Sequence, residues 1–218
     1  MTRLSILIAA ASIVVLSTTQ VHAQSGTFRQ SHDVGFGAEA INVDPASQGR
    51  FWQVTEKTMS RLVRPALNGE PEPNLATEWS ANDSATEWIF KLREGVKFHD
   101  GTDLTADDVR WTWCHQWCPE AKEYATQSGA QSRARIMDKI ETTGPNQVSL
   151  TTTTGVGAVP TLWLSAASSS PWVIFPKREV QHDEAEVEAY SKDPNGAGPM
   201  KLVKHIPSEV MEFERFGD

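Results

Sequence analysis

The chain has 218 residues, of which 39% are hydrophobic and 22% charged, and its formal net charge is −8 at pH 7. This composition is ordinary for a globular protein and does not favour disorder. The acidic balance argues against nucleic acid and anionic membrane surfaces as partners, because both require a basic surface.

The first 23 residues have the pattern of a secretion signal. Arg3 gives a positively charged start, Leu4–Leu16 is an apolar run too short to span a bilayer, and residues 21–23 (VHA) supply a signal-peptidase site. We therefore expect export by the Sec pathway and cleavage after Ala23. Because no cysteine near that point could carry a lipid, we expect a soluble protein in a Gram-negative periplasm.

Hydrophobic spacing predicts both helices and strands in the following residues. A short strand is expected over 27–33. A helix is expected over 50–63, where apolar residues recur at helical spacing. Residues 70–73 (EPEP) are expected to be extended. Residues 86–93 (TEWIFKLR) alternate between apolar and polar side chains, which predicts a half-buried strand.

A second helix is expected from Ala106 to about Trp117. Thr105 is a favourable N-cap, and Asp108 stands three residues later as in a capping box. Pro119 cannot continue the helix and should end it. Helical spacing predicts that its buried face comprises Ala106, Val109, Trp113 and Trp117.

Two β-hairpins are expected in the second half of the chain. The first spans 136–152 around a turn at 144–146 (GPN), and the second spans 201–215 around a turn at 207–208 (PS). Paired strands with interspersed helices indicate a mixed α/β (α+β) architecture.

Several stretches of the sequence match, in order, the motifs of a known family. Residues 73–79 (PNLATEW) follow P-x-L-A-x-x-W, residues 90–101 (FKLREGVKFHDG) follow F-x-L-R-x-G-V-K-F-H-D-G, and residues 104–109 (LTADDV) follow L-T-A-x-D-V. Residues 196–202 (GAGPMKL) are similar to G-T-G-P-Y-x-L, and residues 43–45 (VDP) stand where the family has L-D-P. The chain thus resembles the extracellular solute-binding proteins of family 5, which bind dipeptides, oligopeptides and nickel.

The resemblance implies a periplasmic-binding-protein-like fold of two lobes, of which this chain would contain the N-terminal lobe and a subdomain inserted in it. The expected parts are a signal peptide (1–23), the first part of the lobe (24–58), the inserted α/β subdomain with the family motifs (59–175) and the return to the lobe (176–218). Family members are more than twice as long, so we expect a fragment that stops before the second lobe.

The function that the resemblance implies is capture of peptides or peptide-like solutes in the periplasm and delivery to the membrane permease of an ABC importer. A nickel chelate, an opine or a sugar remains open as cargo, and so does a truncated relic without transport function. A monomer is expected. The sequence contains no legible nucleophile–base pair, zinc-protease motif or P-loop, so neither an enzyme nor a cofactor is predicted.

The resemblance also places one wall of the solute site on four residues: Gln48, Trp52, Trp117 and Trp172. Aromatic faces would contact apolar or cationic groups of the solute, and a few polar atoms would orient it. A core role stays open for Trp117, which fits the buried face of its helix, and for Trp52, which departs only slightly from the Phe51/Met59 face of its own. The matched motifs themselves are expected to be scaffold, with Gly95 at positive φ and residues 99–101 closing a turn.

Cys114 and Cys118 lie one helical turn apart, with His115 between them. A disulfide would suit an oxidising periplasm, and this spacing is within reach of one. Two free thiols remain an alternative. A metal-handling protein that uses these three residues is a rival class, but His115 would face another side of the helix, and no metal site is predicted.

Overall fold

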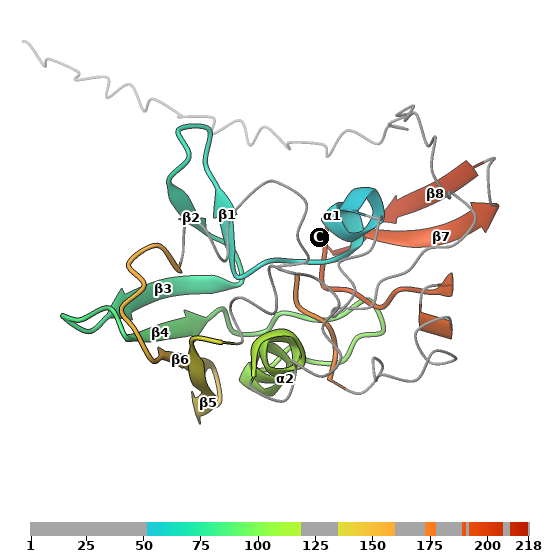
Figure 1. Ribbon diagram of the computed structural model, residues 1–218. Helices are drawn as coiled ribbons and strands as arrows, with labels where there is room; N and C mark the ends of the chain where they lie inside the picture. Colours follow the sequence, from blue (N-terminus) through green and yellow to red (C-terminus); the bar gives the residue numbers. More distant parts are fainter. Residues whose placement is uncertain are drawn as a thin grey trace, which may run out of the picture. The chain divides into compact units, whose positions relative to one another are not determined.

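A four-stranded antiparallel sheet is the largest element of the computed structural model, which describes residues 52–118, 135–159, 173–177, 189–190, 192–206 and 210–217 (Figure 1). The strands lie in the order β3 (Ala76–Ala81), β4 (Glu87–Leu92), β6 (Gln147–Thr152) and β5 (Met137–Gly144). The strand predicted over 86–93 and the hairpin predicted over 136–152 are confirmed. The signal peptide and the strand predicted over 27–33 lie outside the described residues.

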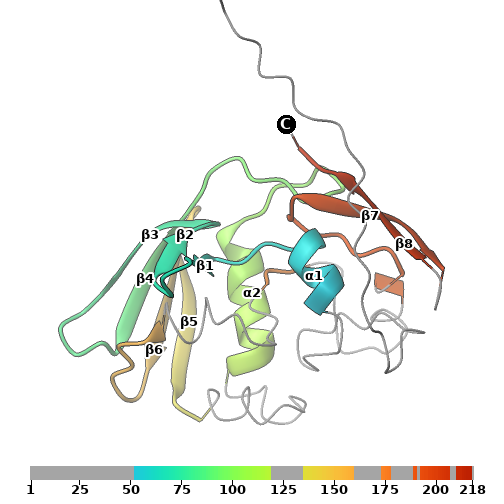
Figure 2. The ribbon, with the colours of Figure 1, turned by 90° about the horizontal axis from the view of Figure 1, so that it is seen from above.

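The alternation in β4 determines which face of the sheet is buried. Trp88, Phe90 and Leu92 are buried, while the residues between them are more exposed. The ring of Phe90 stacks on Trp88 at 6.3 Å between centroids and meets Trp113 of helix α2 edge-on at 5.5 Å. Helix α2 (Ala106–Trp117) therefore covers this face and forms the main hydrophobic core with it (Figure 2).

Helix α2 begins and ends where the sequence predicts. The backbone N–H and the hydroxyl of Thr105 both donate to Oδ2 of Asp108, each at 2.7 Å, so the carboxylate caps the first turn. On the predicted buried face, Ala106, Val109 and Trp113 are buried, and the side chain of Trp117 is not described.

The helix predicted over 50–63 is confirmed only in its first half. Helix α1 ends at Thr58 (Trp52–Thr58), and the chain continues into strand β1 (Val63–Pro65), which pairs with β2 (Pro71–Pro73). Residues Met59 and Leu62 are buried, as their spacing indicates, but they reach the core from extended backbone. Tertiary hydrogen bonds at Thr58 and Ser60 replace the bonds that a longer helix would make.

The predicted second hairpin is formed by β7 (Met200–Ile206) and β8 (Val210–Arg215), and its turn lies outside the described residues. Helix α1 packs on β7. Both elements contribute to a second hydrophobic cluster, which consists of Val54, Met59, Val173, Phe175, Tyr190 and Leu202. Within the described part of the chain, no helix is long and apolar enough to cross a membrane.

Candidate functional site

The extended segment Val173–Lys177 lies between α2 and the residues that follow α1. On the α2 side, the hydroxyl of Thr112 accepts the N–H of Phe175 at 3.1 Å and donates to the carbonyl of the same residue at 3.3 Å. On the other side, the N–H of Ile174 donates to the carbonyl of Ser60 at 2.9 Å. The segment is thus held by hydrogen bonds along both of its edges.

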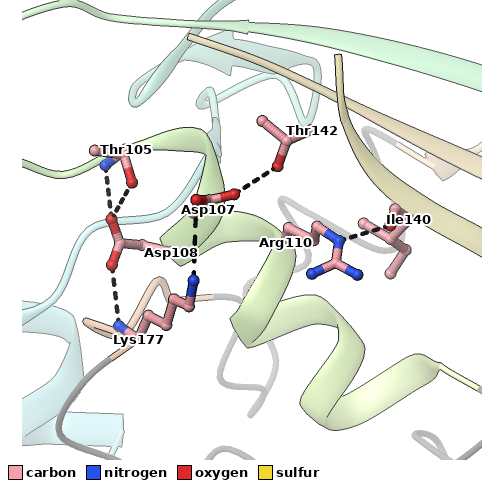
Figure 3. A network of polar contacts seen from close by, with 7 residues as sticks. All are labelled: Thr105, Asp107, Asp108, Arg110, Ile140, Thr142 and Lys177. Atoms are coloured by element: carbon pink, nitrogen blue, oxygen red, sulfur yellow. Dashed lines mark hydrogen bonds and ion pairs between the residues drawn. The ribbon is translucent and has the colours of Figure 1, made fainter. Parts of the chain in front are cut away.

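The first turns of α2 hold this segment and strand β5 at the same time (Figure 3). Oδ1 of Asp108 accepts the backbone N–H of Lys177 at 3.0 Å. Asp107 accepts from the hydroxyl of Thr142 in β5 at 2.9 Å, and its other oxygen lies 3.9 Å from Nζ of Lys177. Nε of Arg110 donates to a carbonyl of β5 at 3.2 Å. Two adjacent carboxylates thus fix the position of the helix relative to its neighbours.

The glycine-rich stretch before β7 passes against the end of α1. The N–H of Gly198 donates to the carbonyl of Thr58 at 2.8 Å, and the hydroxyl of Ser60 donates to the carbonyl of Ala197 at 2.7 Å. A Cβ atom at Gly196 would lie 1.8 Å from the carbonyl oxygen of Thr58. Only glycine therefore allows this approach, which explains why the motif contains it.

His99 contacts this glycine-rich stretch (196–198), which we call the crossover. Its ring lies 3.0 Å from the carbonyl of Gly198 through Nε2 and accepts the N–H of Gly196 at Nδ1, 3.4 Å away. Its backbone N–H donates to the carbonyl of Gly196 at 2.8 Å. Since Nδ1 accepts, Nε2 carries the proton and donates. Burial lowers the pKa of His99 by desolvation, against weaker opposing effects of its backbone hydrogen bonds.

The sequence predicts turns at Gly95 and over residues 99–101, and the positive φ of Gly95 and Gly101 confirms them. It gives no sign of the contact between His99 and the crossover, because the two are far apart in the chain. It also does not reveal the roles of Thr112 and Ser60, for which no local pattern gives a signal.

The four predicted wall residues are not tested by the geometry. Gln48 and Trp172 lie outside the described residues. Trp52 begins α1 and Trp117 ends α2, but the side chains of both are not described. The described neighbours of two of them, Val54 and Val173, belong to the same buried cluster.

Cys114 and Cys118 are joined by a disulfide, with their Cα atoms 4.4 Å apart. Neither sulfur is then a thiolate that could bind a metal, which removes two of the three ligands of the rival metal-handling class. Among the residues that the structure describes, no group of three or more metal-ligating side chains occurs.

Comparison with known families decides the assignment. Residues 70–218 match the family described as bacterial extracellular solute-binding proteins, family 5 middle. The chain belongs to this family. Its members are solute-binding proteins and not enzymes.

Two relatives illustrate how much of a family 5 protein the chain covers. It is 31% identical over 144 residues to the periplasmic murein peptide-binding protein MppA of Escherichia coli, covering 62% of this chain and 25% of the relative. It is 29% identical over 172 residues to the dipeptide-binding protein DppE of Bacillus subtilis, covering 74% of this chain and 31% of the relative. The chain thus spans about a quarter to a third of the length of these curated relatives.

Solved structures show the same fold. The oligopeptide-binding protein AppA of Bacillus subtilis, in complex with a nonapeptide, matches with a TM-score of 0.67 at 23% identity, over 79% of this chain and 34% of that one. NikZ of Campylobacter jejuni, in complex with Ni(L-His), matches with a TM-score of 0.64 at 24% identity, over 81% of this chain and 34% of that one. This family 5 member therefore has the fold of about one third of such a protein.

Proposed function

We propose that this chain belongs to the solute-binding component of an ABC importer, which captures peptides or peptide-like solutes in the periplasm and delivers them to a membrane permease. The observation that carries the proposal is the match of residues 70–218 to the family model. The names of MppA and DppE, both peptide-binding relatives, favour peptides over other cargo.

We further propose the organisation that the family resemblance implies. Residues 1–23 direct export, residues 24–58 and 176–218 belong to the N-terminal lobe, and residues 59–175 form the inserted subdomain. The pairing of Arg61 with Val173, near the two ends of the proposed subdomain, supports these boundaries, because it brings entry and exit of the subdomain together.

The proposed wall of the site consists of Gln48, Trp52, Trp117 and Trp172. A peptide has an apolar or charged side chain at most positions and polar groups along its backbone. Indole faces suit contact with the side chains, and the amide of Gln48 can donate a hydrogen bond to the backbone of the peptide or accept one from it. Capture requires no bond to be made or broken, so the protein needs only to enclose the solute and exclude water.

Binding by the purified exported protein tests this function. An equimolar tripeptide library is added, bound peptide is separated by gel filtration, and the retained species are identified by mass spectrometry. A nickel–histidine chelate, an opine and a sugar are tested in parallel. Because the solute is expected to be enclosed between two lobes, residues 24–218 alone should bind weakly or not at all, so the protein is tested as the organism exports it. Retention of peptides by that protein is expected. Selective retention of another solute would overturn the proposed cargo, and no retention at all would overturn the proposed function.

Two substitutions test the wall. Trp52→Ala and Trp172→Ala are each expected to weaken binding of the retained tripeptide about tenfold, through loss of an aromatic contact. Trp79→Ala is the matched control, because Trp79 is a half-buried tryptophan of β3 that packs on the main core. Equal affinity of all three variants would show that the wall is placed wrongly.

A further inference from the structure

Helix α2 presents two side chains, Asp108 and Thr112, to the backbone of Val173–Lys177. We propose that these are positioning residues, which set solute affinity by fixing this segment against the helix. The inference rests on the proposed function, in which Trp172, directly before the segment, and Trp117, at the end of α2, line the site. Asp108 and Thr112 lie on one face of the helix, since they are four residues apart.

Thr112 holds the segment through both of its hydrogen-bonding capacities. Its hydroxyl accepts from the N–H and donates to the C=O of Phe175, and both residues are about 1% exposed. In a buried environment such bonds resist displacement by water, and loss of the hydroxyl leaves two backbone groups to be satisfied anew. The hydroxyl therefore fixes how Phe175 sits along the axis of α2.

Asp108 uses one carboxylate oxygen for each of two tasks. Oδ2 caps α2 through Thr105, and Oδ1 accepts the N–H of Lys177. An amide in its place has a single acceptor oxygen, so it could serve only one of these tasks. Asp108 is also buried, whereas neighbouring Asp107 is exposed. The start of the helix and the end of the segment are thus joined by one buried side chain.

Thr112 stands on the same helix as one proposed wall residue and bonds the segment that follows another in sequence. Thr112 lies less than two turns before Trp117 on the same helix, and Phe175 follows Trp172 closely in the same segment. The segment cannot follow a different path without also breaking its bond to Ser60 on the opposite edge. A shift of the segment along α2 would therefore move the chain that leads to residue 172 relative to the helix that carries Trp117, and we expect such a shift to alter solute affinity.

The experiment compares variants of the full exported chain. Thr112→Val keeps the shape of the side chain and removes the hydroxyl, and Thr112→Ser keeps the hydroxyl. Thr142→Val is the matched control, because its hydroxyl bonds Asp107 on the same helix but not the segment. Val148→Ala, a core change in β6, controls for loss of stability alone. Asp108→Asn is paired in the same way with Asp107→Asn.

Two quantities are measured: amide hydrogen exchange at residues 174–177, and affinity for the tripeptide that the wild-type protein retains. For Thr112→Val and Asp108→Asn we expect about tenfold faster exchange in the segment and about fivefold to tenfold weaker binding. Thr112→Ser, Thr142→Val, Val148→Ala and Asp107→Asn are expected to remain within about twofold of wild type in affinity.

The outcomes separate this inference from the function on which it rests. Wild-type exchange and affinity in Thr112→Val would overturn the inference and leave the proposed function intact. Equal loss of affinity in Val148→Ala would also overturn it, by showing that stability alone is responsible. Failure of the wild-type protein to bind any solute would overturn the proposed function and the claim on affinity, while the exchange data would still decide whether Thr112 and Asp108 hold the segment.

Discussion

The contact between Gly196 and the end of α1 gives the most demanding test of the fold. In Gly196→Ala, the new Cβ would stand 1.8 Å from the carbonyl oxygen of Thr58 and 2.7 Å from Sδ of Met59. Real Cβ atoms essentially never approach other atoms within 3.0 Å, so the two backbones must separate. Thr58 is fully buried and its carbonyl accepts the N–H of Gly198, so it cannot simply turn away.

The cost follows from what the separation breaks. It stretches the bond from Gly198 to Thr58 and the bond from His99 to Gly196, each contributing about 1 kcal/mol. Strain in the packed neighbours adds about 1–3 kcal/mol. We therefore expect Gly196→Ala to lower the free energy of unfolding by about 3–5 kcal/mol, which is large against the about 5–15 kcal/mol typical of a whole protein.

Urea unfolding followed by tryptophan fluorescence measures this loss as a lower midpoint at unchanged slope. Gly157→Ala is the matched control, because a Cβ there would meet nothing within 4 Å. Its free energy of unfolding should stay within about 0.5 kcal/mol of wild type. A loss below about 1 kcal/mol in Gly196→Ala would refute the close approach of the crossover to Thr58.

Three further predictions concern the buried histidine, the disulfide and the core. Because burial lowers the pKa of His99, stability should be complete above the ordinary histidine pKa of about 6.5 and fall as the pH drops below it. Urea midpoints at pH 7.5 and pH 5 should differ less in His99→Gln than in wild type. Part of the difference between the two pH values should remain, because desolvation also lowers the pKa of His205. A difference as large as that of wild type would contradict the prediction. Replacing both Cys114 and Cys118 by alanine should cost up to about 2 kcal/mol, the chain-entropy value for so short a loop, and a reductant should then have no further effect on the urea midpoint. Phe90→Ala should cost about 3–5 kcal/mol in the same assay, since its ring is fully buried, and a loss under about 1 kcal/mol would mean that β4 is packed differently.

Local patterns sufficed where an element is specified by its own residues. Strand β4 follows from its alternation, and α2 follows from Thr105 and Asp108, because a cap and its helix are neighbours in sequence. The same reasoning extended α1 too far. Periodicity correctly marked Leu62 as buried, but it could not reveal that Ser60 bonds Ile174, a partner more than a hundred residues away.

The candidate site was less predictable than the fold, for the same physical reason. The tryptophans are predicted as wall residues because an indole ring suits contact with a solute, and this chemistry does not depend on which residues surround it. Thr112 is an ordinary helical residue in sequence, and its role arises only when Phe175 lies beside it. Family motifs identified His99, but its contact with Gly198 depends on the crossover being in place.

The long separation of the partners at the end of α1 also has a consequence for the order of folding. The hydroxyl of Ser60 and the carbonyl of Ala197 are 137 residues apart, so at about 5–20 residues per second the ribosome adds the second on the order of ten seconds after the first. Until then, the residues at the end of α1 lack their hydrogen-bonding partners in the crossover, and the hydrophobic cluster beside α1 is incomplete. A chain that cannot complete its core early remains a substrate for chaperones, which suits a protein that, as proposed, must cross a membrane before it folds.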